Sequence, residues 1–125
     1  MTISNYLELQ LLDTLDGSGQ AYSASATFLK LHIGDPGEDG TANPAAETTR
    51  KACTFTGAST VSGVGTKVST GAEWTLVAAT ETYSHWSMWD AETSGNPLWY
   101  GALSANAAVT AGDTFEITSL TLTLN

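Results

Sequence analysis

The pattern of apolar and polar residues is most distinctive between residues 83 and 103. Two runs rich in aromatic side chains, 83–90 and 98–103, flank a polar segment that contains Gly95 and Pro97. Such runs on either side of a Gly- and Pro-containing segment are typical of a β-hairpin. Each large aromatic side chain can bury roughly 150–250 Å², and three of the four tryptophans lie in this stretch. We therefore predict that this hairpin dominates the core.

The N-terminal segment has a helical period instead of an alternating one. Apolar residues recur there every four positions, at Ile3, Leu7, Leu11 and Leu15. This spacing places them on one face of an α-helix, which Ser4 or its neighbour can cap and the glycines at 17 and 19 can end. The pattern predicts a helix over residues 4–16. Its leucine face either packs against a sheet of the same domain or belongs to a peripheral arm that docks on a neighbouring subunit.

Turn residues divide most of the remaining chain into short apolar or alternating runs. These runs predict strands at 26–33, 50–56, 67–70, 73–77, 104–110, 114–117 and 120–124. Trp74 anchors one of them, and the last alternates Leu and Thr as a strand with one buried face does. With the helix and the hairpin, they predict a single domain over residues 1–125. The expected fold is mainly β, an antiparallel β-sandwich of jelly-roll-like type, with the N-terminal helix at one end or edge.

Composition and charge narrow the classes of partner. Charged residues make up 14% of the chain, against about 25% in an average soluble protein. The formal net charge is −9 with four basic residues, and such a surface repels nucleic acid and anionic membranes. No run approaches the roughly 20 consecutive apolar residues that span a bilayer, and no secretory signal is visible. We expect neither nucleic acid nor a membrane as a partner.

Residues that could carry chemistry are few and scattered. His32 lies near Asp35 and His85 near Asp90, but no G-x-S-x-G motif accompanies them to complete a nucleophilic triad. We expect His85 to be partly exposed or at an interface. The single cysteine, Cys53, cannot form an intrachain disulfide and is expected to be a buried thiol, which fits synthesis in a reducing compartment. We therefore predict no catalytic residue and no enzyme.

The acidic residues match no metal-binding motif. A Gly-rich loop over residues 34–44 carries Asp35, Glu38 and Asp39, and Ca²⁺ prefers oxygen ligands on such loops. Their spacing does not match an EF-hand, so we interpret the segment as a solvated acidic loop. No pair of glutamates has a spacing typical of a glycosidase. We expect no metal and no other cofactor.

Four neighbouring aromatic residues raise the question of a sugar-binding platform: Trp86, Trp89, Trp99 and Tyr100. Successive side chains of a strand point to opposite faces, so at least one member of each pair should lie in the core. We expect these rings to pack in the core or at a subunit interface, with carbohydrate binding as the alternative.

Four motifs follow one another over nearly the whole chain. They are Ser-Asn-Tyr-Leu-Glu at 4–8 leading to Leu-Leu-Asp at 11–13, Leu-His-Ile-Gly-Asp-Pro-Gly at 31–37, the aromatic stretch at 83–103, and Val-Thr-Ala-Gly-Asp-Thr-Phe at 109–115. In this order they resemble a family of small structural proteins of tailed bacteriophages. That family is often labelled as tail fibre protein, and related β domains act as capsid decoration proteins. The motifs look like determinants of the fold, so the resemblance carries over no catalytic residue.

The resemblance implies a virion protein made in the bacterial host cytoplasm. The first hypothesis is a protein that decorates the outer surface of a capsid as a symmetric oligomer such as a trimer, with the major capsid protein or other virion proteins as partners. A net charge of −9 favours the outside, because packaged DNA would repel it. The alternative is a tail-fibre or baseplate component that binds a host glycan. The candidate interface residues are Leu7, Leu11, His85, Trp89 and Trp99.

Overall fold

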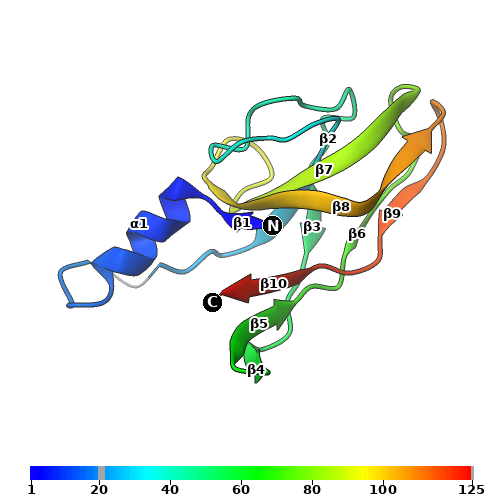
Figure 1. The fold of residues 1–125 in the computed structure, drawn as a ribbon. Helices are drawn as coiled ribbons and strands as arrows, with labels where there is room; N and C mark the ends of the chain where they lie inside the picture. Colours follow the sequence, from blue (N-terminus) through cyan, green and yellow to red (C-terminus); the bar gives the residue numbers. More distant parts are fainter. Residues whose placement is uncertain (20–21, 125) are drawn as a thin grey trace.

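The fold, seen in a computed structural model that describes residues 1–19 and 22–124, is mainly β with one helix (Figure 1). The elements in chain order are β1 (Thr2–Ile3), α1 (Asn5–Asp13), β2 (Thr27–His32), β3 (Lys51–Cys53), β4 (Ser59–Val61), β5 (Val64–Val68), β6 (Ala72–Trp74), β7 (Glu81–Trp89), β8 (Pro97–Val109), β9 (Phe115–Ile117) and β10 (Thr121–Leu124). The predicted fold class, mainly β with an N-terminal helix, is confirmed. The last residue of the predicted domain, Asn125, lies outside the described residues.

The largest sheet has five antiparallel strands in the order β1-β8-β7-β2-β3. Its centre is the hairpin of β7 and β8, so the aromatic stretch lies where it was predicted. The turn between these strands is closed by Asp90, whose carboxylate accepts hydrogen bonds from the backbone N–H of Asn96 at 2.7 Å and from its side-chain amide at 3.0 Å. The first half of the hairpin is the best-buried part of the chain, with Trp86, Met88 and Trp89 all nearly inaccessible.

The pairing of β7 with β8 is interrupted at Ser84. Between paired positions, β7 advances two residues from Tyr83 to His85, while β8 advances five from Ala102 to Ala107. The extra residues form a bulge, which bends a strand without ending it. The prediction of a separate strand at 104–110 is therefore wrong, because β8 continues through the bulge to Val109.

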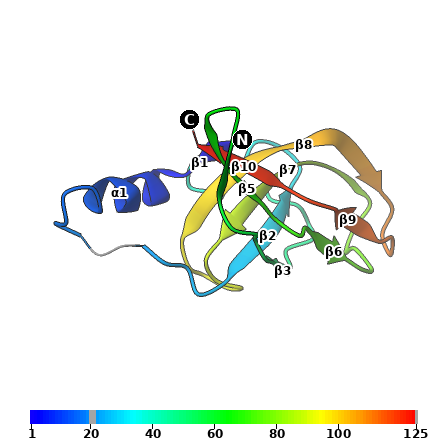
Figure 2. The same cartoon turned by 90° about the horizontal axis from the view of Figure 1, so that it is seen from below.

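Two smaller antiparallel sheets pack against one face of the large sheet (Figures 1 and 2). One has three strands in the order β10-β5-β4, and the other pairs β6 with β9. The layers share one hydrophobic core, to which the large sheet contributes Leu31, Trp86 and Trp99 and the small sheets contribute Trp74, Ile117 and Leu122. This arrangement agrees with the predicted sandwich, whereas the jelly-roll connectivity is not confirmed.

Helix α1 begins where it was predicted and ends three residues early, at Asp13 instead of 16. The hydroxyl oxygen of the N-cap residue Ser4 accepts a hydrogen bond from the Leu7 N–H at 3.2 Å, and the same hydroxyl donates to the Pro97 carbonyl at 2.6 Å. The helix start is thus tied to β8. At the other end, the Thr14 hydroxyl donates to the Leu11 carbonyl at 2.7 Å and closes the last turn before the glycines are reached.

Candidate functional site

Helix α1 carries an apolar surface that the other described residues leave uncovered. No residue of the helix is buried, and the exposed fractions are 61% for Leu9, 61% for Leu12 and 80% for Leu15, just past the helix end. These three residues are called the outer leucine face below. In both views the helix extends sideways from the sheets instead of lying across them (Figures 1 and 2). Apolar side chains gathered on one projecting element are typical of an interaction surface.

The first turn of the helix is held to the body by aromatic and polar contacts. Tyr6 packs edge-on against Tyr22, with ring centroids 5.8 Å apart. The Tyr22 hydroxyl donates a 3.0 Å hydrogen bond to the carboxylate of Asp90 in the hairpin turn. Burial, together with this carboxylate, raises the pKa of Tyr22, so its phenol keeps the proton that it donates. The start of the helix is therefore fixed to the sheet, while its outer leucine face points to solvent.

A groove runs between α1 and β10. It contains two hollows, with volumes of about 300 and 290 Å³. Leu11 and Leu124 line both hollows, so the two form one continuous feature, called the α1–β10 groove below. Leu7, Trp99 and Leu122 complete the apolar wall of the first hollow. Ile3 and Leu12 complete that of the second, so Leu12 belongs both to the outer leucine face and to the rim of the groove.

The groove is apolar with a charge near each end. Among its described lining residues, Lys67 supplies a cation to the first hollow and Glu8 a carboxylate to the second. Trp99 is 8% exposed, and its indole N–H is buried without a hydrogen-bond partner among the described residues. A groove of this kind suits apolar side chains from another segment, and it offers no set of polar groups that would orient a small polar ligand.

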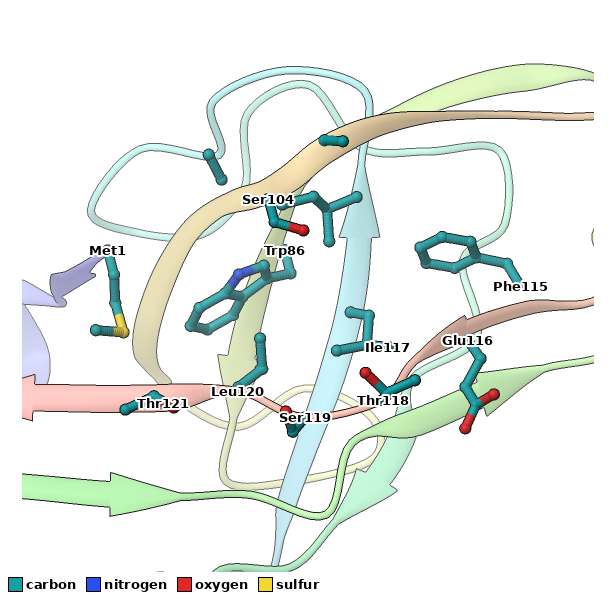
Figure 3. A pocket seen from close by; sticks show the side chains of 13 residues that line it. Met1, Trp86, Ser104, Phe115, Glu116, Ile117, Thr118, Ser119, Leu120 and Thr121 are labelled. Atoms are coloured by element: carbon teal, nitrogen blue, oxygen red, sulfur yellow. The ribbon is translucent and has the colours of Figure 1, made fainter.

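A further cavity, of about 390 Å³, lies elsewhere, between the bulge of β8 and the segment Phe115–Thr121 (Figure 3). Met1 and Trp86 are among its lining residues, and the carboxylate of Glu116 points away from Trp86 in this view. The polar groups on its walls are mainly hydroxyls, including that of Ser104. Among the described lining residues, Glu116 is the only ionisable side chain, so the cavity does not contain the pair of acid and base groups that hydrolysis of a glycoside uses.

The structure brings three of the five candidate interface residues together. Leu7, Leu11 and Trp99 all line the α1–β10 groove. His85 and Trp89 lie on β7, away from it; His85 is half-buried, and Trp89 is 6% exposed beneath the guanidinium of Arg50, 3.9 Å from the ring centroid. Whether any of them contacts another chain stays a prediction.

Sequence reasoning identified only one member of the outer leucine face, Leu15. Leu9 and Leu12 fall outside the four-residue period that selected Leu7, Leu11 and Leu15. The available signal was a count: six of the residues from 3 to 15 are Ile or Leu, more than one buried stripe of a short helix can use.

The first histidine of the sequence is a buried structural residue. His32 is inaccessible to solvent, its Nδ1 lies 2.9 Å from the Ala42 carbonyl oxygen, and its Nε2 lies 2.7 Å from the Ser87 hydroxyl. A carbonyl can only accept, so Nδ1 carries the proton and Nε2 accepts from Ser87. The Ser87 oxygen accepts in turn from the indole N–H of Trp89 at 2.8 Å. Each polar atom of this chain of contacts is used within the fold.

We expect the protein to lose stability as the pH falls from about 6.5 towards 5. Burial lowers the pKa of His32 from its ordinary value of 6.5; the Ala42 carbonyl opposes this shift, and the neighbouring Lys30 and His85 add to it. Between the two pKa values, the His32 side chain is protonated in the unfolded chain and neutral in the folded chain. The stabilisation is complete above the unfolded pKa and declines below it. Urea unfolding at a series of pH values should show this decline, and a His32→Gln variant, though weaker overall, should show a flatter profile over the same range.

A His85→Gln variant is the matched control for this measurement. His85 lies beside His32 in the β2–β7 register but is only half-buried, with its Nδ1 2.8 Å from the Ser84 hydroxyl. Because His32 is intact in this variant, the decline between pH 6.5 and 5 should persist. If His85→Gln flattened the profile and His32→Gln did not, the assignment to His32 would be wrong.

The acidic loop is organised by its own backbone. Asp35 accepts a hydrogen bond from the Gly37 N–H at 2.9 Å, and Asp39 accepts from the Thr41 N–H and hydroxyl at 3.1 and 2.8 Å. The hydrogen bonds from Thr41 lower the pKa of Asp39. Short Asp side chains commonly stabilise turns in this way. Within residues 1–19 and 22–124, no group of three or more His, Cys, Asp or Glu side chains is arranged to hold a metal ion.

Two glutamate side chains likewise accept hydrogen bonds from backbone N–H groups. The buried carboxylate of Glu47 accepts from the Thr49 N–H at 3.2 Å and the Ala78 N–H at 3.1 Å. The carboxylate of Glu81 accepts from the Ala46 and Glu47 N–H groups at 3.0 and 3.2 Å.

Cys53 is 4% exposed, as predicted for a buried thiol. No helix among the described residues has the length and hydropathy needed to span a membrane.

Comparison with known proteins gives one family. A family model described as "Podophage GP4 fiber I protein gp80" matches residues 2–125. No curated protein matches the chain. The match covers every helix and strand described above, and it agrees with the resemblance to tailed-phage structural proteins.

Proposed function

This chain belongs to the family of podophage GP4 fiber I protein gp80, and from that membership we propose that it is a structural subunit of a phage fibre, held in the virion through helix α1. The proposal gives the protein no enzymatic role. Its partners are virion proteins, either further copies of the chain or a different component. Decoration of the outer capsid surface, the first hypothesis from the sequence, is the rival location.

The observation that supports this function is the uncovered helix. A helix of nine residues is shorter than the roughly 12–15 residues at which isolated helices become even marginally stable in water. Tertiary packing normally stabilises so short a helix, yet α1 has no buried residue and leaves Leu9 and Leu12 61% exposed. Covering these leucines with another protein would remove the apolar surface from water and stabilise the helix at the same time.

We expect a Leu12→Glu substitution to remove the protein from the virion. The charge would have to be buried in the contact, which is costly when it is unpaired, while the free chain should fold normally because Leu12 is 61% exposed. Phage carrying the variant gene would be purified and their protein content measured against wild-type particles. Leu76→Glu, at a leucine that is 77% exposed and far from the helix, is the matched control and should be incorporated normally. Normal incorporation of Leu12→Glu would contradict the proposal.

The location in the particle separates fibre from capsid. A fibre subunit should appear only in the projections attached to the tail, whereas a decoration protein should cover the capsid lattice. Reconstruction of intact particles, with antibody labelling of the chain, measures this directly. The family description supports the fibre, and the net charge of −9 is compatible with either exposed position.

Binding of a host glycan is the second candidate from the sequence. The tryptophans proposed for stacking are 2% exposed at Trp86, 6% at Trp89 and 8% at Trp99, and only Tyr100 is half-buried. Stacking on a sugar needs an accessible ring face, so these rings favour packing within the subunit over a platform.

A further inference from the structure

We propose that the partner of helix α1 is a second copy of this chain, with the outer leucine face of one subunit seated in the α1–β10 groove of the next. This inference rests on the proposed function and names the partner of the same surface. It differs from a contact with another virion protein because both halves of the contact, the projecting leucines and the apolar groove, are present on one chain.

The α1–β10 groove has room for the outer leucine face. The hollows of the groove measure about 300 and 290 Å³, and a cavity of about 150 Å³ suffices for one small apolar group such as benzene. Together the hollows therefore accommodate about four side chains of leucine size. The outer leucine face offers Leu9, Leu12 and Leu15, all more than half exposed.

The position of the groove also suits a helix from a neighbour. One wall is the subunit's own α1, through Leu7 and Leu11, and the other is β10, through Leu122 and Leu124. A second α1 laid in the groove would pack against the first one and against the strand, so each helix would be covered on two sides. Reciprocal exchange between two copies closes a dimer, and exchange around an axis closes a ring.

Charge favours a second copy as the occupant. The helix sequence Asn5–Asp13 contains Glu8 and Asp13 and no basic residue. The first hollow presents Lys67, one of only four basic residues in a chain of net charge −9. Lys67 is exposed, and its Nζ lies 5.9 Å from the ring centroid of Phe55. Glu8 itself lines the second hollow, so the helix carboxylate that can meet Lys67 of a neighbouring copy is that of Asp13, which is exposed and lines neither hollow.

The test is the self-association of the purified full-length chain, measured by sedimentation equilibrium at several concentrations. The wild-type chain should form a closed oligomer. Leu12→Glu should weaken association roughly a hundredfold, because an apolar contact is lost and a charge must be buried. Leu76→Glu should leave it unchanged. Circular dichroism and urea unfolding of each variant show whether the subunit fold is intact.

A charge exchange decides whether the second copy occupies the groove. Lys67→Glu alone, and Asp13→Lys alone, should each weaken association by up to about fivefold, as expected for reversing an exposed ion pair. The variant with both substitutions should regain wild-type association, because the charges again differ between helix and groove. Only a contact between copies predicts this recovery in a single purified chain.

The failures of the two proposals are distinguishable. A wild-type chain that stays monomeric, or a Lys67→Glu, Asp13→Lys double variant that does not recover, overturns the homotypic contact. If Leu12→Glu nevertheless removes the protein from virions, the structural role stands and another virion protein covers the helix. An oligomer that Leu12→Glu leaves intact overturns the assignment of the contact to α1.

Discussion

Replacing Gly71 with alanine is expected to lower the free energy of unfolding by about 3–5 kcal/mol, a large part of the roughly 5–15 kcal/mol available to a domain of this kind. Gly71 has a φ of +80°, which already disfavours any residue with a Cβ. A Cβ there would also overlap the carbonyl oxygen of Ile117 and lie 2.6 Å from the carbonyl carbon of Thr118. Both neighbours are backbone, so the link between β9 and β10 would have to shift.

A Gly63→Ala variant separates the cost of the left-handed backbone from the cost of the steric overlap. Gly63 has a nearly identical φ of +81°, but a Cβ added there meets nothing within 4 Å. The substitution should therefore cost only the conformational term, about 1–2 kcal/mol. Urea unfolding of wild type and both variants measures the difference. Equal losses for the two variants would show that the close approach at Gly71 is relieved without cost, contrary to this expectation.

The close approach at Gly71 could not be predicted from the sequence. From the sequence, Gly71 separates two strands, and its left-handed backbone is a reasonable expectation for a turn glycine. What cannot be inferred is that the turn lies against residues more than forty positions later, where Ser69 is buried and its hydroxyl accepts a 3.1 Å hydrogen bond from the Leu120 N–H. That contact depends on how the sheets stack, which no local pattern encodes.

The parts of the fold that were predicted are those with strong local periods. The β7–β8 hairpin follows from its aromatic runs and its turn residues, and the start of α1 from its N-cap and leucines. The same local reasoning extended the helix to 16 and broke β8 near Ser104, because the polar, exposed residues of the bulge resemble a loop. The division into three sheets depends on long-range pairing, such as that of Leu122 with Lys67, and could not be predicted.

The candidate site was predicted in part for the same reason. A helical period identifies Leu7 and Leu11 as members of one face, and the structure places both in the groove with Trp99. The period cannot tell whether that face meets the chain's own sheet or leaves a hollow beside it. In the structure both are true, since the first turn is anchored through Ser4 while Leu9 and Leu12 stay exposed. Packing on its own domain is thus seen at the first turn of the helix, and docking of its exposed leucines on another chain stays a prediction.

Replacing Trp74 with alanine should cost about 3–5 kcal/mol of unfolding free energy, the range for removing a fully buried Trp or Phe side chain. Trp74 is the predicted anchor of its strand, and it is completely inaccessible. Its ring lies 6.0 Å from that of Phe115, its cross-strand partner. Its indole N–H donates a 2.8 Å hydrogen bond to the Thr49 carbonyl, which joins β6 to the loop before β3. Alanine would leave a cavity and would remove this hydrogen bond.

Trp74→Phe divides that loss between packing and hydrogen bonding. Phenylalanine keeps an aromatic ring against Phe115 but cannot donate to the Thr49 carbonyl, so it should cost about 0.5–1.5 kcal/mol, the net contribution of a typical hydrogen bond. Urea unfolding gives both free energies, and hydrogen exchange at the backbone of residues 49–53 should quicken in both variants if the indole holds this segment. A phenylalanine variant as unstable as the alanine variant would mean that the hydrogen bond, and not the volume of the ring, makes Trp74 the anchor of the small sheet. The edge of the core that faces β3 would then depend on a polar contact, which the hydrophobic pattern of the sequence does not reveal.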